Sequence, residues 1–135
     1  MAGQARKADS MTYELELPNL PYPSLNTRRS KLYDGGSIKA WREASGWAAR
    51  EAKVPKLDCP TVQLHFYPGD NRRRDRINLA LVHKAVVDGL VDAGVLTDDS
   101  PEHVVELMPA IHKGTGERRW VLRLEPAHLW SEVPF

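Results

Sequence analysis

Four arginines and one aspartate fall within five consecutive positions near the middle of this chain, where residues 72–76 read RRRDR. An arginine side chain binds a phosphate group through paired hydrogen bonds, and a carboxylate oxygen is a ligand that Mg²⁺ prefers. The cluster therefore combines phosphate-binding groups with a candidate metal ligand. Because the formal net charge of the whole chain is only +1, this positive charge is local and can attract an anionic partner to one place.

More charged side chains follow further along the chain. Lys84 and Asp88 are four positions apart, and Asp98 and Asp99 are adjacent. Two carboxylates within about 4 Å repel by roughly 4 kcal/mol at an effective dielectric constant of about 20, so a site that gathers them needs a cation. Oxygen ligands suit Mg²⁺ or Mn²⁺, and a lysine can neutralise charge that develops on a phosphate. Together with the arginines, these residues indicate a metal-assisted site for phosphodiester hydrolysis.

Each of these features also has a purely structural explanation. Asp75 can cap a helix, residues 97–102 (TDDSPE) can form a turn and the start of a helix, and Lys84 and Asp88 can form an ordinary surface pair. An arginine run between a strand and a helix is often a solvated connection. Two interpretations therefore stay open, a catalytic site and a structural ion-pair network, and the combination of the features favours the first.

Alternating apolar and polar residues predict the strands that support these groups. Residues 13–17 and 62–66 alternate in this way, and residues 104–108 and 120–124 do so again nearer the C-terminus. We expect the last two segments to form a hairpin, because residues 112–117 (HKGTGE) between them contain two glycines.

Two segments have the spacing of amphipathic helices. Apolar or small residues recur every three or four positions in residues 38–52 and again in residues 78–93. We expect Ser37 to cap the first helix and Gly94 to end the second in a left-handed conformation. The order strand, helix, strand, helix, strand, strand predicts a small α+β domain.

Length and composition set the domain organisation. The 135 residues suit a single domain. We expect a disordered tail at residues 1–10, the folded domain at residues 11–126 and a C-terminal tail at residues 127–135. No apolar run reaches the roughly 18 residues that span a bilayer, and the first residues lack the apolar part of a signal peptide, so we expect a cytoplasmic protein without membrane contact. The single cysteine, Cys59, fits a reducing compartment and excludes a disulfide scaffold.

The remaining aromatic and histidine residues predict no additional site. The five histidines lack the spacing of paired metal ligands, and His83 is expected at a solvated position on the second helix. Trp41 and Trp47 are expected in the core or at a contact between subunits.

The central stretch of the chain resembles the RusA family of Holliday-junction resolvases, of the kind found in phages and actinobacteria. The family signature has arginines followed by Asp-x-Asp-Asn-Leu, then a helical Lys-x-x-x-Asp-x-Leu, then a glycine and Asp-Asp. Here residues 72–79 read RRRDRINL, residues 84–90 read KAVVDGL and residues 92–99 read DAGVLTDD. The first strand and the PYPSLN segment at residues 21–26 are similar too, so the resemblance extends over residues 13–125.

The resemblance implies a RusA-like, small mixed β-sheet with two main helices and a homodimer that nicks opposing strands of a four-way DNA junction with Mg²⁺, or with Mn²⁺ in its place. It implies catalytic roles for Asp75, Lys84 and Asp99. The implied metal ligands are Asp75, Asp98 and Asp99, with Asn78 as an additional oxygen donor.

One position departs from the family pattern. Ile77 stands where the family has its second aspartate, and an isoleucine cannot bind a metal ion. Two alternatives follow: an endonuclease that works with fewer protein ligands, since Mg²⁺ readily keeps several waters, or a junction-binding module of the same fold with weakened or lost cleavage. Asp88 matches the helical aspartate of the family and is expected to be structural.

The basic residues are expected to hold the DNA backbone. The expected phosphate contacts are Arg72, Arg73, Arg74 and Arg76, with Lys113, Arg118 and Arg119 as possible extensions of that surface. Contacts with phosphates position DNA without reading its bases, and they weaken as salt rises because counterions are released on binding. Since two symmetric cuts need two sites, a two-fold dimer is expected.

Overall fold

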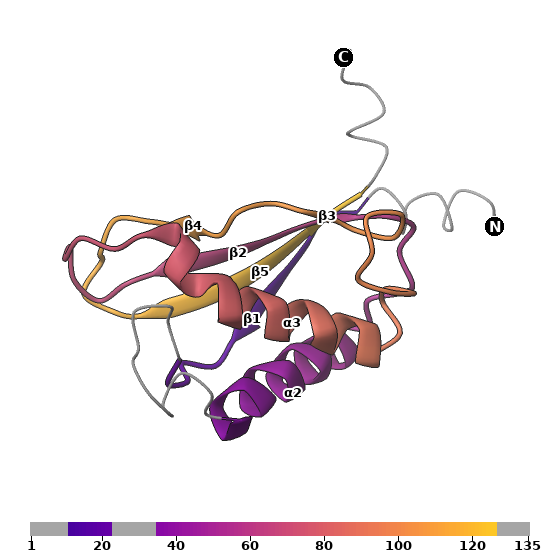
Figure 1. Ribbon diagram of the computed structural model, residues 1–135, viewed down its shortest axis with the longest axis horizontal. Helices are drawn as coiled ribbons and strands as arrows, with labels where there is room; N and C mark the ends of the chain where they lie inside the picture. Colours follow the sequence, from indigo (N-terminus) through magenta and orange to yellow (C-terminus); the bar gives the residue numbers. More distant parts are fainter. Residues whose placement is uncertain (1–10, 23–34, 127–135) are drawn as a thin grey trace, which may run out of the picture.

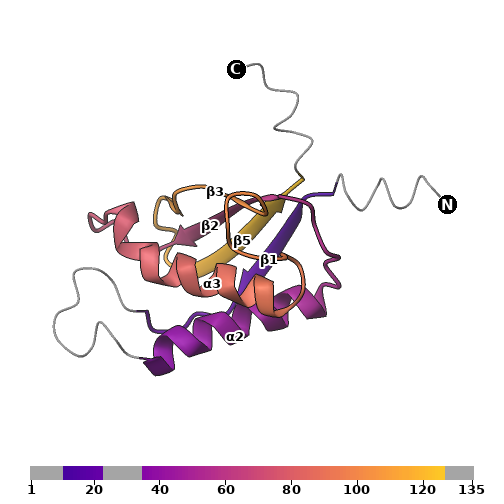
Figure 2. The ribbon, with the colours of Figure 1, turned by 45° about the vertical axis from the view of Figure 1, so that its right-hand side comes forward.

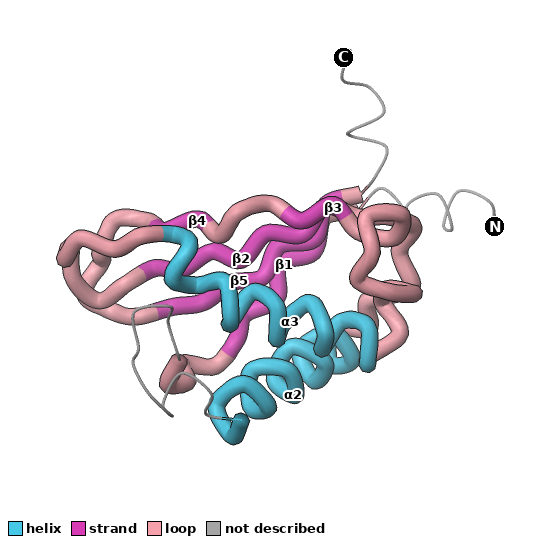
Figure 3. The backbone as a smooth tube through the Cα atoms, in the orientation of Figure 1, coloured by secondary structure: helices cyan, strands magenta, loops and turns pink. Residues whose placement is uncertain are grey.

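Two α-helices pack against one face of a five-stranded mixed sheet in the computed structural model, which describes residues 11–22 and 35–126 (Figures 1 and 3). The predicted small α+β fold with a mixed sheet and two main helices is therefore confirmed. The expected tails, residues 1–10 and 127–135, lie outside the described residues. Among the described residues, neither helix is long and apolar enough to cross a membrane.

The sheet has the strand order β1-β5-β2-β3, with the short β4 also beside β2. Strand β5 (Arg119–Glu125) pairs antiparallel with β1 (Tyr13–Leu17) on one side and with β2 (Thr61–Tyr67) on the other. Strands β3 (Val105–Glu106) and β4 (Ala110–Ile111) pair parallel with the other side of β2. The strands predicted for residues 13–17 and 62–66 are thus confirmed as β1 and β2.

The predicted hairpin between residues 104–108 and 120–124 is wrong, because β2 lies between these segments in the sheet. Of the first segment only Val105–Glu106 is a strand, β3. Strand β4 lies beyond the segment, after Pro109, which has no amide hydrogen to donate to the sheet. Residues 112–118 then cross the end of β2 to start β5 on its far side. They form a crossover, not a hairpin tip.

The two helices begin differently from the prediction. Helix α2 (Gly35–Glu51) already includes Ser37, so the predicted cap is wrong, and the Ser37 hydroxyl donates to the Pro21 carbonyl (2.9 Å) instead. Helix α3 (Ala80–Asp92) follows a 3₁₀ turn, η2 (Arg76–Leu79). Gly94 has φ +81°, which confirms the predicted left-handed residue after α3.

The core lies between the helices and one face of the sheet. The inward-facing strand residues are Leu15, Leu17, Val62, Leu64, Phe66, Trp120, Leu122 and Leu124. Trp41 of α2 is fully buried against Trp120, with ring centroids 4.8 Å apart, and its indole nitrogen donates to the Pro21 carbonyl (2.9 Å). Trp47, also on α2, is by contrast 65% exposed.

Helices α2 and α3 approach each other closely (Figure 2). The buried Ser45 hydroxyl of α2 donates to the Val86 carbonyl of α3 (2.7 Å). A methyl group at Gly89 would overlap the Arg42 carbonyl oxygen and lie 2.8 Å from the Ser45 Cβ. Two hydrogen bonds from Arg42 to Asp92 (2.6 and 2.8 Å) join the helices at the solvent side. The contact fixes the position of α3 on the sheet.

Substitution of Gly89 should therefore be costly. Gly89→Ala forces the helices apart, and we expect it to lower the free energy of unfolding by about 3 kcal/mol in urea denaturation. Gly69→Ala is the matched control, because the nearest atom to the added methyl group, the Gly116 carbonyl oxygen, is 4.0 Å away. Equal stability of the two variants would contradict the close helix contact.

Candidate active site

Lys84 is the centre of a charged cluster on α3. Its Nζ lies 2.8 Å from Asp99 Oδ2 and 3.2 Å from Asp88 Oδ1. Asp88 lies one turn further along the helix, whereas Asp99 comes from the loop that follows Gly94. The structure thus brings together the predicted lysine, the helical aspartate and one acid of the predicted pair.

The loop after α3 turns back because its first residues bond to the end of the helix. The Val95 and Leu96 amides both reach the Leu90 carbonyl (3.0 and 3.4 Å), and both side chains are buried. Residues 97–103 continue as turns and bends without the helix start that TDDSPE allowed. In this loop Asp98 Oδ1 accepts a hydrogen bond from the Asp99 amide (2.8 Å), which orients Asp99 towards Lys84.

Hydrogen bonding and charge hold Lys84 and Asp99 in their ionised forms. The hydrogen bond to Asp99, followed by the one to Asp88, raises the pKa of Lys84 above its ordinary value. In return, the hydrogen bond from Lys84 lowers the pKa of Asp99. Lys84 is therefore a fixed cation through the neutral range, which suits stabilisation of an anion and does not suit a proton acceptor.

Asp75 and Asn78 lie in a second group of predicted site residues. Asp75 precedes η2, but its side chain makes no capping hydrogen bond, so the helix-cap explanation fails. A pocket of about 290 Å³ is lined by Tyr22, Arg73, Arg74, Asp75, Asn78, Leu79 and Ile111. This pocket places the first predicted acid beside two of the arginines.

The predicted acids do not form one closed metal cage. Among the described residues, no three His, Cys, Asp or Glu side chains come together in a group that could hold a metal ion. Asp98 and Asp99 lie in the loop that contacts Lys84, whereas Asp75 and Asn78 line the pocket. Neither group alone supplies three such ligands, so an ion at either place would take one or two carboxylates and complete its shell with waters and substrate phosphate oxygens, as Mg²⁺ does.

Ile77, at the position of the missing acid, points to solvent. It is a residue of η2 and is 51% exposed. An aspartate could replace it without burying a charge.

The arginine cluster divides into bound and free side chains. Arg72 Nε and an Arg74 terminal nitrogen contact the two oxygens of Asp70 (3.1 and 2.8 Å). Arg74 is only 16% exposed, and it also donates to the carbonyls of Asp70 and Arg72. Arg73 and Arg76 are exposed and make no hydrogen bond or ion pair with another described residue. Arg74 is therefore held inside the loop, and Arg73 and Arg76 are available for phosphates.

Asp70 is a residue of the site that the sequence pattern did not predict, although it precedes Arg72 by two positions and Arg74 by four. The hydrogen bond from the Arg72 amide, followed by the one from Arg74, lowers the pKa of Asp70. Asp70 thus stays ionised and organises the loop that carries Asp75.

The second basic segment lies against the arginine loop. The Gly114 amide donates to Asn71 Oδ1 (2.7 Å), and a side chain at Gly114 would overlap the Asp70 carbonyl. In Figure 1 the two loops run side by side at the end of the sheet beyond β2. Lys113, which is exposed, therefore lies near the cluster, whereas Arg119 is paired with Glu16 (2.8 Å).

The sequence pattern also did not predict the contacts of three histidines, His65, His83 and His112. His83 is not solvated: its Nε2 lies 2.7 Å from Glu106 Oε1, and its side chain is 14% exposed. His65 Nδ1 and His112 Nε2 are 2.8 Å apart, and desolvation, followed by His112, lowers the pKa of His65. His65 and His112 come from separate segments beside each other in the sheet, so spacing along the chain could not reveal the pair.

Comparison with known proteins adds no relative: no family model matches the chain, and neither does any curated protein.

The contact between Lys84 and Asp99 can be tested directly. Asp99→Asn should lower the pKa of Lys84 towards its ordinary value, because the charge-assisted hydrogen bond is lost. An NMR titration of the Lys84 side chain measures this. Asp98→Asn is the matched control, since Asp98 contacts the Asp99 amide and not Lys84, and it should change the Lys84 pKa less. An unchanged Lys84 pKa in Asp99→Asn would contradict the contact.

Proposed function

We propose that this chain is a structure-specific endodeoxyribonuclease of the RusA type, which nicks four-way DNA junctions with Mg²⁺, or with Mn²⁺ in its place, in the bacterial cytoplasm. The observation that carries the proposal is the position of Lys84 between two carboxylates, 2.8 Å from Asp99 and 3.2 Å from Asp88, on the helix that follows the arginine loop. The arginines before α3, which can bind phosphates, and the carboxylates beside Lys84, which are candidate metal ligands, support the proposal.

Each group has a defined part in this proposal. Arg73 and Arg76 hold backbone phosphates, and Lys84 stabilises negative charge that develops on the phosphate under attack. Asp98 and Asp99 would supply the carboxylate ligands of the metal ion, which would provide Lewis-acid polarisation of the phosphate when bound, whereas Asp75 belongs to the separate group that lines the pocket. Asp88 keeps Lys84 extended along the helix.

A purely structural ion-pair network accounts less well for the cluster. The side chain of Lys84 is 63% exposed and that of Asp99 is 38% exposed. Exposed pairs of this kind contribute about 0–1 kcal/mol to stability. Stability alone therefore gives little reason to gather these charges, and a ligand gives a better one.

The second candidate is a junction-binding module that cuts weakly or not at all. It is favoured by the exposed Ile77 in place of the second acid and, among the described residues, by the lack of three acidic or histidine ligands in one group. Such a protein would keep the basic surface and its preference for branched DNA.

Cleavage of a synthetic four-way junction tests the proposal. With Mg²⁺ or Mn²⁺ we expect paired nicks, and Asp99→Asn should slow cleavage by about 100-fold or more because it removes both a metal ligand and the partner of Lys84. Glu43→Gln is the control, since Glu43 is an exposed residue of α2 paired with Lys39. If Asp99→Asn cut as fast as Glu43→Gln, the proposed site would be wrong.

The two candidates separate in the variant Ile77→Asp. A gain in cleavage, with junction affinity nearly unchanged, would identify the natural chain as a weakened nuclease. Tight binding without cutting in both proteins would support the binding module.

Binding of junction DNA should depend on salt through Arg73 and Arg76. Each of Arg73→Ala and Arg76→Ala should lower the slope of log K against log salt by about 0.9 if it removes one phosphate contact, with an unchanged melting temperature. Fluorescence anisotropy over about 50–200 mM salt measures the slope. Arg74→Ala is the comparison: because Arg74 is tied to Asp70, this change should lower the melting temperature. Unchanged slopes for Arg73→Ala and Arg76→Ala would favour the structural network.

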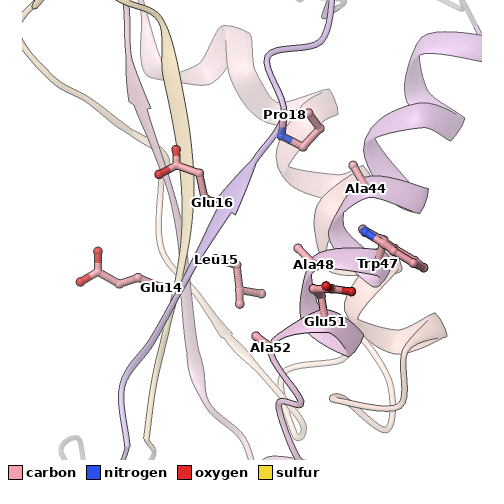
Figure 4. Close-up of a pocket in the computed structure, with 9 residues that line it drawn as sticks. All are labelled: Glu14, Leu15, Glu16, Pro18, Ala44, Trp47, Ala48, Glu51 and Ala52. Atoms are coloured by element: carbon pink, nitrogen blue, oxygen red, sulfur yellow. The ribbon is translucent and has the colours of Figure 1, made fainter.

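We also propose that two copies associate next to Trp47. A groove of about 350 Å³ lies between β1 and α2, and Figure 4 shows Leu15 pointing from β1 towards the helix residues that line it. An exposed tryptophan beside an apolar groove is typical of a subunit contact. A two-fold dimer would supply one site for each of two opposing nicks.

Sedimentation equilibrium tests the dimer. The expected mass is twice the chain mass of 15.2 kDa, and Trp47→Glu should return it to 15.2 kDa. Met108→Glu is the control, since Met108 is 53% exposed but does not line the groove. A dimer that persists in Trp47→Glu would place the contact elsewhere.

A further inference from the structure

The pocket beside the arginine loop has a fixed apolar part. Tyr22 contacts Phe66 and Trp120 edge to face, with ring centroids 5.8 and 5.1 Å apart, and the Arg118 guanidinium lies 5.5 Å from the centre of its ring. Ile111 of β4 also lines the pocket. Because Tyr22 is held by these neighbours, the apolar lining exists before any ligand binds.

The polar lining has unused hydrogen-bonding groups. The side chains of Asp75 and Asn78 make no hydrogen bond to another described residue, and Arg73 is equally free. Arg74, the other arginine of the pocket, is held by Asp70 (2.8 Å). One cation, one acceptor and one amide, each without a partner among the described residues, therefore line the same pocket as an aromatic ring.

We infer that this pocket takes one unpaired nucleotide of the branched DNA, with its base inside and its phosphate on Arg73; the inference rests on the proposed function for its DNA substrate. The volume of about 290 Å³ suits one nucleotide and not a base pair. Unpaired bases are bound by aromatic contact together with hydrogen bonds to their exposed edges, and the lining offers both.

The acid in the pocket determines which bases fit. A carboxylate only accepts hydrogen bonds, whereas an amide both donates and accepts. On its exposed edge guanine presents two adjacent donors, N1–H and the 2-amino group, to the carboxylate of Asp75, whereas adenine and cytosine present one amino group and thymine only its N3–H. The pocket therefore prefers guanine, and this selectivity would act on a nucleotide at the branch point.

Binding of single nucleotides tests the pocket without a junction. The four deoxynucleoside 5′-monophosphates are titrated by NMR or calorimetry at low salt with EDTA, so that no metal ion bridges phosphate and protein. dGMP should bind about 5-fold or more tightly than dTMP and inorganic phosphate, because it alone donates two adjacent hydrogen bonds to a carboxylate. Asp75→Asn should reduce this preference, and Arg73→Ala should weaken binding of all four.

Arg72→Ala separates the pocket from general attraction to the arginines. Arg72 is adjacent to Arg73 and carries the same charge, but it does not line the pocket. Affinity for dGMP within about 2-fold of the natural protein is expected for this variant. Equal loss in Arg72→Ala and Arg73→Ala, or equal affinity for dTMP and dGMP, would overturn the inference.

A junction with 2-aminopurine at the branch point connects the pocket with the proposed substrate. Its fluorescence should rise on binding when the base leaves the stack, and this rise should be lost in Asn78→Leu. Nucleotide binding in the pocket with no affinity for junctions would reject the proposed function and retain the nucleotide site. Junction binding and cutting without nucleotide selectivity or fluorescence change would reject the pocket and retain the nuclease.

Discussion

The close contact between α2 and α3 is the constraint on which the rest of the structure depends. The buried hydrogen bond from Ser45 to the Val86 carbonyl and the missing side chain at Gly89 bring the helix backbones together. Because α3 is pressed into this position, Lys84 is fixed on its outer surface and the following loop starts from a defined point. The geometry of the charged cluster is therefore set by apolar packing on the opposite side of the helix, and not by the charges themselves.

Burial divides residues of one type into different roles. Arg74 is mostly enclosed and bonded to Asp70, so its charge serves the loop, whereas the neighbouring Arg73 and Arg76 remain in solvent. A run of identical side chains contains no information about this division, because the direction of each side chain depends on the turn that the backbone makes. The loop thus combines a rigid interior with free cations on its surface, which suits binding of a flexible polyanion.

Local patterns predicted the elements, and contacts between distant segments escaped prediction. Periodicity is a property of each segment by itself, so β1, β2 and both helices were found, and Gly94 marked the end of α3. The partner of residues 120–124 depends on where β2 inserts, which no short-range pattern reveals, and the hairpin was therefore wrong. In the site, the contact between Lys84 and Asp88 could be predicted, because residues four positions apart lie on the same face of a helix. The approach of Asp99 depends on burial of the loop after Gly94, and the grouping of Asp75 with the arginines depends on the pocket.

The proline between β3 and β4 has a consequence for how the sheet meets other molecules. A free edge of a sheet presents unpaired amide and carbonyl groups on which another chain can add a strand. Here Pro109 breaks one border into two-residue pieces, so that side offers too short a ladder for a foreign strand. In the described part of the chain the opposite border is the continuous strand β1. A strand from another chain would therefore pair with β1, and not with the edge formed by β3 and β4.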